Sequence, residues 1–167
     1  MLKKRWISLY VENEIGVLAR ISGLFSSKSY NVGSLTVGET EDSTISRMTI
    51  GLTSDDQTFE QIKKQLNRSV EVIKVVDFTD VPIHMKEILF VKVTSCKEKD
   101  KEELFRVAKV FDLRITDYDK STVLLESVQT EARNNDVIQL LSSSFCNRIE
   151  VVRGGSVAIE AVSISER

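Results

Sequence analysis

NEIGVLARISGLFSSKSYNVGSLTV, residues 13–37, is the stretch that decides how the first half of the chain folds. It follows a strand-like run at residues 6–11 and opens with a polar turn that ends at Gly16. A second strand-like run, residues 33–40, comes after it. The apolar residues in between fall on one face at helical spacing and predict an amphipathic helix: Val17, Leu18, Ile21, Leu24 and Phe25.

The turn before this helix has the chemistry of a small anion site. A glycine at a strand-to-helix turn lets a ligand or another backbone approach closely. The first N–H groups of a helix lack internal partners and carry the positive end of the helix dipole, which suits a carboxylate. Asn13 precedes the helix and Asn31 follows it, so either amide is a candidate partner for an amino acid. On the local pattern alone, Gly16 is equally consistent with a plain turn, and Asn13 with a turn or capping residue.

The first half of the chain contains a complete structural unit in the order βαββαβ. Its strand-like runs are residues 6–11, 33–40, 46–52 and 70–78. A second helical pattern aligns Phe59, Ile62 and Leu66, and Ser54 with Gln57 fits a capping box that makes Ser54 the N-cap. This order predicts an α+β fold of the ferredoxin-like type, an antiparallel four-stranded sheet with both helices on one face. Arg47 alternates with Met48 along the third run and faces either a partner or water.

The second half repeats the pattern without repeating the residues. Strand-like runs at residues 88–94, 114–118, 122–127 and 148–152 alternate with helical patterns at 99–111 and 131–142. The only proline, Pro82, marks a linker between the units. We therefore expect a first ferredoxin-like domain at residues 1–80, a linker at 81–86, a second ferredoxin-like domain at 87–155 and a tail at 156–167 whose fold the sequence leaves open. The second unit lacks the Asn-x-x-Gly turn, so we expect the anion site described above in the first unit and not in the second.

Several short matches identify a family. Residues 12–20 (ENEIGVLAR), 23–25 (GLF), 30–32 (YNV), 34–37 (SLTV) and 46–49 (SRMT) resemble the regulatory, small subunit of acetolactate synthase, also called acetohydroxyacid synthase. The N-terminal part resembles an ACT domain, a small module that senses amino acids. The likeness is close over residues 1–80 and looser but colinear to about residue 155.

The resemblance implies a function. The partner is the large catalytic subunit, which carries thiamine diphosphate, magnesium and FAD; this chain needs no cofactor of its own. The catalytic subunit joins two pyruvates, or pyruvate and 2-oxobutanoate, in branched-chain amino-acid biosynthesis. The small chain raises that activity and confers feedback inhibition, most often by valine, and it forms a homodimer through its ACT domains. The implied effector-binding residues are Asn13, Gly16, Val17, Leu18, Asn31 and Val32.

Composition limits the alternatives. The formal net charge of −2 gives no field that favours nucleic acid or an anionic membrane, and no apolar run reaches membrane-spanning length, so we expect a cytoplasmic protein. His84 is the only histidine, which leaves no second one for a metal site or a catalytic relay. The alternative function is an amino-acid-responsive transcription regulator with an ACT sensor. This sequence, however, has no evident helix-turn-helix and no cluster of basic residues for DNA binding. A third possibility is a stand-alone enzyme, but nothing in the sequence assembles the nucleophile–base pair that such an enzyme needs.

Overall fold

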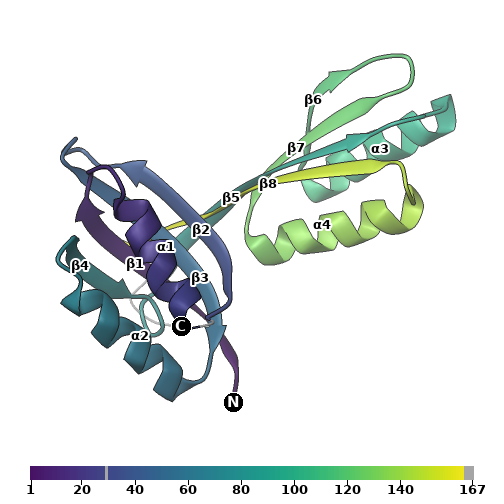
Figure 1. Cartoon of the computed structure of the whole chain (residues 1–167). Coiled ribbons are helices and arrows are strands. Elements are labelled where there is room, and N and C mark those ends of the chain that lie inside the picture. Colours follow the sequence, from purple (N-terminus) through teal and green to yellow (C-terminus); the bar gives the residue numbers. More distant parts are fainter. Residues whose placement is uncertain (29, 164–167) are drawn as a thin grey trace. The chain divides into compact units, whose positions relative to one another are not determined.

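The computed structural model describes residues 1–28 and 30–163 and contains two compact units (Figure 1). The first unit combines residues 1–84 with the C-terminal segment that begins at Ser156, and the second is Met85–Gly155. Each unit has a four-stranded sheet and two helices in the order βαββαβ. The expected fold class, two ferredoxin-like units in tandem, is confirmed.

In the first unit the strand order is β2-β3-β1-β4, so β2 and β4 are the edges of the sheet. All three pairings between neighbouring strands are antiparallel. The elements are β1 (Lys3–Glu12), α1 (Val17–Ser27), β2 (Val32–Glu39), β3 (Ile45–Ser54), α2 (Asp56–Arg68) and β4 (Val72–Asp77).

The core of this unit lies between the sheet and its two helices. Alternate residues of β1 point toward the helices, and Ile7 and Leu9 face Ile50 and Met48 across the ladder. The helices cover these strands with one apolar stripe each, formed by Val17, Ile21 and Phe25 of α1 and by Phe59, Ile62 and Leu66 of α2. Phe25 and Phe59, on the apolar faces that the helical spacing predicts, are buried in this core, and so is Met48.

The second unit has the strand order β6-β7-β5-β8 and its own core beneath α3 and α4. Its elements are β5 (Ile83–Val93), α3 (Glu98–Phe111), β6 (Arg114–Tyr118), β7 (Val123–Gln129), α4 (Glu131–Ser144) and β8 (Ile149–Glu160).

Two of these strands are longer than the sequence indicated. β5 begins at Ile83, inside the expected linker at residues 81–86, and β8 continues through residue 160, into the expected tail. Pro82 lies directly before β5, where its missing N–H costs no ladder bond. The end of β8 has a weak two-residue period, with Ser156 and Ala158 buried and Val157 exposed, which sequence reading did not distinguish from a loop.

Helix α2 is capped by Asp55 and not, as expected, by Ser54. The Asp55 side chain accepts a hydrogen bond of 2.7 Å from the Thr58 N–H. Ser54 is the last residue of β3, where its side chain is buried on the core face and its hydroxyl has no hydrogen-bond partner. The predicted N-cap was one residue too early because β3 continues to Ser54, two residues beyond the strand expected at 46–52.

Helix α1 begins at a glycine in the left-handed region. Gly16 is the N-cap, with φ of 86°. A Cβ at this position would lie 2.9 Å from Nη1 of Arg20, whose side chain folds back over the turn. Gly23, in the middle of the same helix, has no heavy atom within 4 Å of the place a Cβ would take.

These caps predict opposite outcomes at neighbouring residues. Asp55→Ala should lower the melting temperature by roughly 3–6 °C because α2 loses its cap. Ser54→Ala should leave the melting temperature unchanged or raise it, since the lost hydroxyl is buried without a partner. The hydrogen bond from the Thr58 backbone lowers the pKa of Asp55, so its contribution is complete above the ordinary value of 3.8 and is lost as pH falls through the lowered pKa. Thermal melts at pH 7 and at acid pH test both points.

The two glycines of α1 form a second matched pair. Gly16→Ala should destabilise the fold by about 1 kcal/mol, because an alanine in the left-handed region is strained. Gly23→Ala should stabilise it by roughly 0.5–1 kcal/mol, because alanine loses less conformational freedom in a helix interior. Urea unfolding of both variants measures the two signs; equal effects would mean that the Gly16 turn relaxes freely.

Candidate functional site

The turn that contains Asn13 is fixed to the hairpin between β2 and β3. The Asn13 N–H donates to the Thr44 carbonyl at 2.8 Å. Because β1 and β2 both run antiparallel to β3, the end of β1 and the end of β2 lie at the same end of the sheet. Gly16 and the first turn of α1 follow directly, so the candidate anion site is built at this end.

The Asn13 side chain is occupied by contacts within the chain. Its Nδ2 donates to the Ser43 carbonyl at 2.9 Å and to Oε1 of Glu39 at 3.1 Å, and its Oδ1 accepts from the Ser46 hydroxyl at 3.0 Å. Both N–H donors are therefore used, and the Oδ1 retains one further lone pair. Toward an amino acid, Asn13 in this arrangement can accept from an ammonium group but has no spare donor for a carboxylate.

The first turn of α1 supplies the positive side of the candidate site. The Val17 N–H makes a weak bond of 3.3 Å to the Glu14 carbonyl, while the Leu18 N–H lies where the helix offers no acceptor. There is no acidic side chain in this turn to compete for the dipole. The Arg20 guanidinium lies over Gly16 and also pairs with Glu71, which adds a cation beside the turn. Val17 is buried in the core and reaches a ligand only through its backbone, whereas Leu18 is exposed.

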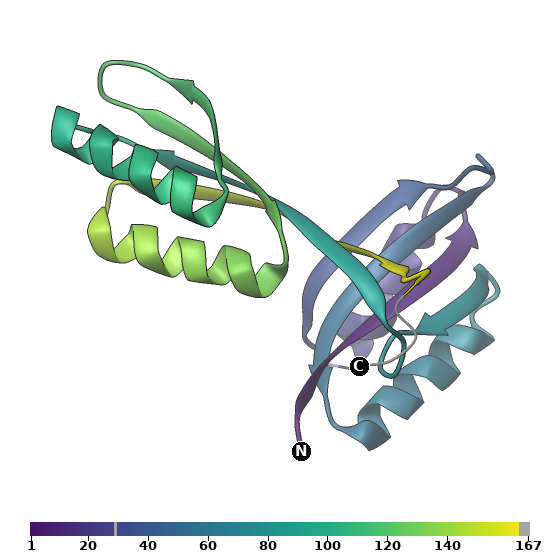
Figure 2. The ribbon, with the colours of Figure 1, turned by 180° about the vertical axis from the view of Figure 1, so that it is seen from behind.

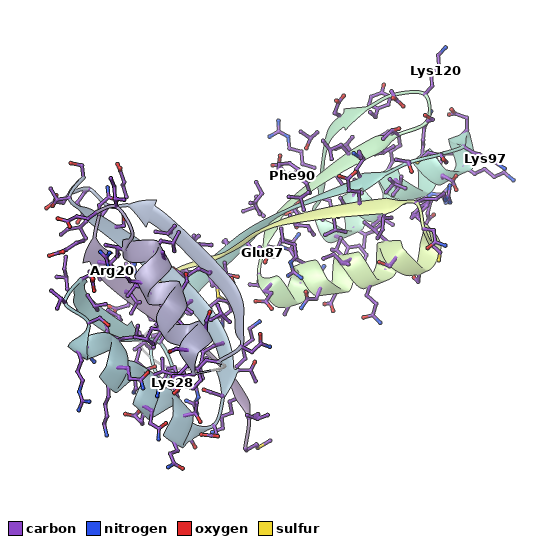
Figure 3. All side chains as sticks on the ribbon, in the orientation of Figure 1. Arg20, Lys28, Glu87, Phe90, Lys97 and Lys120 are labelled. Atoms are coloured by element: carbon purple, nitrogen blue, oxygen red, sulfur yellow. The ribbon has the colours of Figure 1, made fainter. Side chains whose placement is uncertain are left out.

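Asn31 and Val32 lie at the other end of α1. This helix has eleven residues and is thus about 16 Å long. Arg20 near its start and Lys28 at its C-cap mark the two ends in Figure 3. Asn31 is exposed just before β2. The six predicted residues therefore form two groups, Asn13 to Leu18 and Asn31 with Val32, and a single small amino acid cannot touch both within one chain.

Two surface hollows adjoin these groups. One, of about 260 Å³, lies between α1 and β2 and is lined by Ile21, Ser22, Phe25, Ser26, Tyr30, Val32, Leu35 and Ile50. The other, of about 450 Å³, lies beside the Asn13 turn and is lined by Glu12, Asn13, Glu14, Ser43, Thr44, Ile45 and Ile73. Each hollow thus contacts one of the two groups.

The edge strand β2 leaves apolar side chains uncovered on the helix side of the sheet. Leu35 and Val37 face Ile50 and Met48 across the ladder, so they point toward the layer of helices. They are nevertheless 39% and 48% exposed, because α1 does not reach over them. The backbone of β2 pairs with β3 on one side only. This combination of an unpaired strand edge and exposed apolar side chains favours pairing with another chain.

Sequence reasoning missed three polar residues around the turn: Arg20, Glu39 and Ser46. In the sequence, Glu39 belongs with Glu41 and Asp42 to an acidic cluster that is typical of a solvated hairpin tip. Its contact with Asn13 depends on the register of β1, β2 and β3, which the hydrophobic pattern does not specify to the residue. The signal for Ser46 was a polar residue on the core side of a strand.

No group of three or more His, Cys, Asp or Glu side chains within residues 1–28 and 30–163 is arranged to hold a metal ion. In the same part of the chain, no helix combines the length and the apolar character that crossing a membrane requires.

Comparison with known proteins covers both units. The model of the AHAS small subunit-like ACT domain matches residues 7–74, and that of the small subunit of acetolactate synthase matches residues 86–162. The acetolactate synthase small subunit of Aquifex aeolicus is 38% identical over 99% of this chain and 85% of its own length. The acetolactate synthase small subunit of Haemophilus influenzae is 35% identical over 93% of this chain and 94% of its own length.

A solved structure agrees with these matches. The crystal structure of the acetolactate synthase small subunit from Thermotoga maritima is similar to this fold with a TM-score of 0.84 and 30% sequence identity. The similarity covers 97% of this chain and 99% of that one. Full-length likeness in both sequence and fold leaves one conclusion: the chain belongs to the family of acetolactate synthase small subunits.

Proposed function

We propose that this chain regulates a catalytic acetolactate synthase subunit, raising its activity and making it sensitive to inhibition by a branched-chain amino acid, with valine as the first candidate. Membership of the small-subunit family supports a catalytic acetolactate synthase subunit as the partner. The ACT-type first unit, in which α1 begins at Gly16 without a side-chain cap, supports an amino acid as the effector. Thiamine diphosphate, magnesium and FAD belong to the catalytic partner in this proposal, and the chemistry on pyruvate takes place there.

The effector site in this proposal is shared between two copies of the chain. An amino acid that uses both groups of predicted residues needs a second chain, because Asn31 and Asn13 lie at opposite ends of α1. Antiparallel pairing of β2 with β2 of a second copy supplies it. If all of Val32–Glu39 pairs in this way, Val32 of one copy faces Glu39 of the other. Asn31 of the second copy then lies beside Glu39, which already contacts Asn13.

Each part of a free amino acid has a partner in this arrangement. The carboxylate takes the N–H groups of the first turn of α1, at Gly16 to Leu18, where it replaces the weak 3.3 Å bond from the Val17 N–H to Glu14, with the Arg20 cation close by. The ammonium group takes the spare lone pair of the Asn13 Oδ1 and the Glu39 carboxylate. Asn31 of the second copy adds a hydrogen bond, and its neighbour Val32 contacts the branched side chain. An effector bound in this way links two chains and so favours one mode of association.

Such a link is sufficient for regulation. An effector changes activity only when it binds two states of the assembly with different affinity. A coupling free energy of about 1–3 kcal/mol corresponds to a change of roughly 5- to 150-fold. The few hydrogen bonds of one amino acid at a subunit interface are of this order.

A subunit-mixing experiment tests whether the site is shared. Asn13→Ala and Asn31→Ala chains should each fail to bind valine in calorimetry while keeping the wild-type circular dichroism spectrum. After mixing and exchange, a mixed dimer contains one site with both asparagines intact, so about a quarter of all sites should bind again. The unmixed variants are the matched controls.

The results of mixing separate two parts of the proposal. A wild-type protein that binds none of valine, leucine and isoleucine would refute the effector assignment. Wild-type binding with no recovery in the mixture would instead mean that each site is contained in one chain.

Reconstitution with the catalytic subunit tests the partner. The catalytic subunit should consume pyruvate faster in the presence of this chain, and valine should inhibit only the reconstituted complex. Pyruvate consumption is measured with thiamine diphosphate, Mg²⁺ and FAD present, with this chain alone as the control. Activity of this chain alone, or a catalytic subunit indifferent to it, would contradict the proposal.

A further inference from the structure

The end of β8 crosses the face of the first sheet that is opposite the helices. We call residues 156–161 the docked segment. The Ser156 N–H donates to the Ser34 hydroxyl at 3.1 Å, and the Thr36 hydroxyl donates to the Ser156 carbonyl at 3.0 Å. At its far end the Ala161 N–H donates to the Pro82 carbonyl at 2.9 Å. Figure 2, which views the sheet from the side away from α1, shows this yellow end of the chain across the sheet.

Arg47 holds the middle of the docked segment. Its Nη2 donates to the Ala158 carbonyl at 3.2 Å and its Nε donates to the Ser8 hydroxyl at 2.8 Å. The guanidinium also lies over the Tyr10 ring, 5.1 Å from its centre. The sequence left Arg47 facing either a partner or water; its partner is the C-terminal part of its own chain, 111 residues away.

Side chains of the first sheet, and not its backbone, bind the docked segment. The open face of an antiparallel sheet normally meets water. Here Ser8, Thr49 and Ser156 are buried on that face. The Ser8 hydroxyl accepts from Arg47, and both backbone polar groups of Ser156 are hydrogen-bonded, so the burial of these groups is compensated there. Ser34 and Thr36, two residues apart on β2, grip both backbone groups of Ser156. We call Ser34, Thr36 and Arg47 the clamp.

The clamp begins directly where β8 enters the first unit. The boundary between the units falls between Gly155 and Ser156, and Gly155 has φ of 80°. Before the two glycines, Arg153 is held within the second unit by Glu87, with its Nη2 2.9 Å and its Nε 3.1 Å from Oε1. Glu87 in turn accepts from the buried Asn134 amide at 3.0 Å. The chain is therefore held by side-chain contacts on each side of Gly154 and Gly155, which both lie within β8.

The strand that carries two clamp residues also borders the proposed effector site. Glu39 at the end of β2 contacts Asn13, and Val32 and Leu35 line the hollow beside α1. Ser34 and Thr36 point to the other face of the same strand. A shift of β2 that changes its edge or its Glu39 end therefore displaces the backbone of Ser156 as well.

We propose that the clamp transmits the effector-bound state of β2 to the strand that leads into the second unit, with Arg47 as a positioning residue. This inference rests on the proposed function of the first unit as an amino-acid sensor. It requires no contact between effector and docked segment, only that β2 has two positions that the effector binds unequally.

The test removes the clamp without touching the proposed effector residues. Ser34→Ala combined with Thr36→Val deletes the acceptor and the donor that hold Ser156, and Arg47→Lys is the second variant. Thr53→Val is the matched control, because Thr53 lies on the same face of β3 and is exposed. Hydrogen exchange of residues 154–163 should speed up at least tenfold in both clamp variants and stay unchanged in the control.

Function is measured on the complex with the catalytic subunit. Valine affinity in calorimetry should stay within about threefold of wild type, while inhibition of the complex by valine should be lost. A clamp that only stabilised the fold would lower the melting temperature and leave the inhibition curve in place. Full inhibition despite faster exchange in the docked segment, or exchange that does not change at all, would overturn the inference. A wild-type complex that ignores all three branched-chain amino acids would contradict the proposed function, and the regulatory role of the clamp with it.

Discussion

The edge strand β2 is the element on which the arrangement of the first unit depends. One side of its backbone pairs with β3, and the other side is open. On the helix side, Leu35 and Val37 remain uncovered; on the opposite side, Ser34 and Thr36 hold the end of β8. Because β2 contacts β3, the end of β8 and, through Glu39, the Asn13 turn, it cannot move without changing several contacts. Binding of an effector beside β2 would therefore alter contacts elsewhere in the first unit.

The length of α1 imposes the second constraint. The helix is about 16 Å long and separates the anion-attracting turn at Gly16 from Asn31, so in the proposed site the two groups of predicted residues come together by association of two chains and not by folding. A site completed by a second chain joins ligand binding to assembly without a separate relay. Within one chain, the Asn13 side chain is instead satisfied by Ser43, Glu39 and Ser46, which keeps the turn in shape before any ligand binds.

Sequence predicted the parts of the structure that periodicity controls. The order of elements and the core stripe of α2 follow from helical spacing and alternation, and the structure confirms them. The stripe predicted for α1 is confirmed except at Leu18, which is 45% exposed and lies off the face that Val17, Ile21 and Phe25 bury. The sequence did not predict the Asp55 cap, because two adjacent residues both fitted and only the length of β3 decides between them. The sequence could not predict the role of Arg47, because its acceptor, the Ala158 carbonyl, belongs to a weakly patterned segment that is distant in the chain. The separation of Asn13 from Asn31, by contrast, follows from helix rise alone and needed no structure.

Hydrogen exchange along β2 is the most direct test of the central claim, that this edge pairs between chains and that an amino acid stabilises the pair. The account predicts slow exchange for the amides of residues 32–39 at high protein concentration, faster exchange on dilution, and renewed protection when valine is added to the dilute sample. Amides of β2 that exchange at the same rate at every protein concentration, with and without valine, would contradict it.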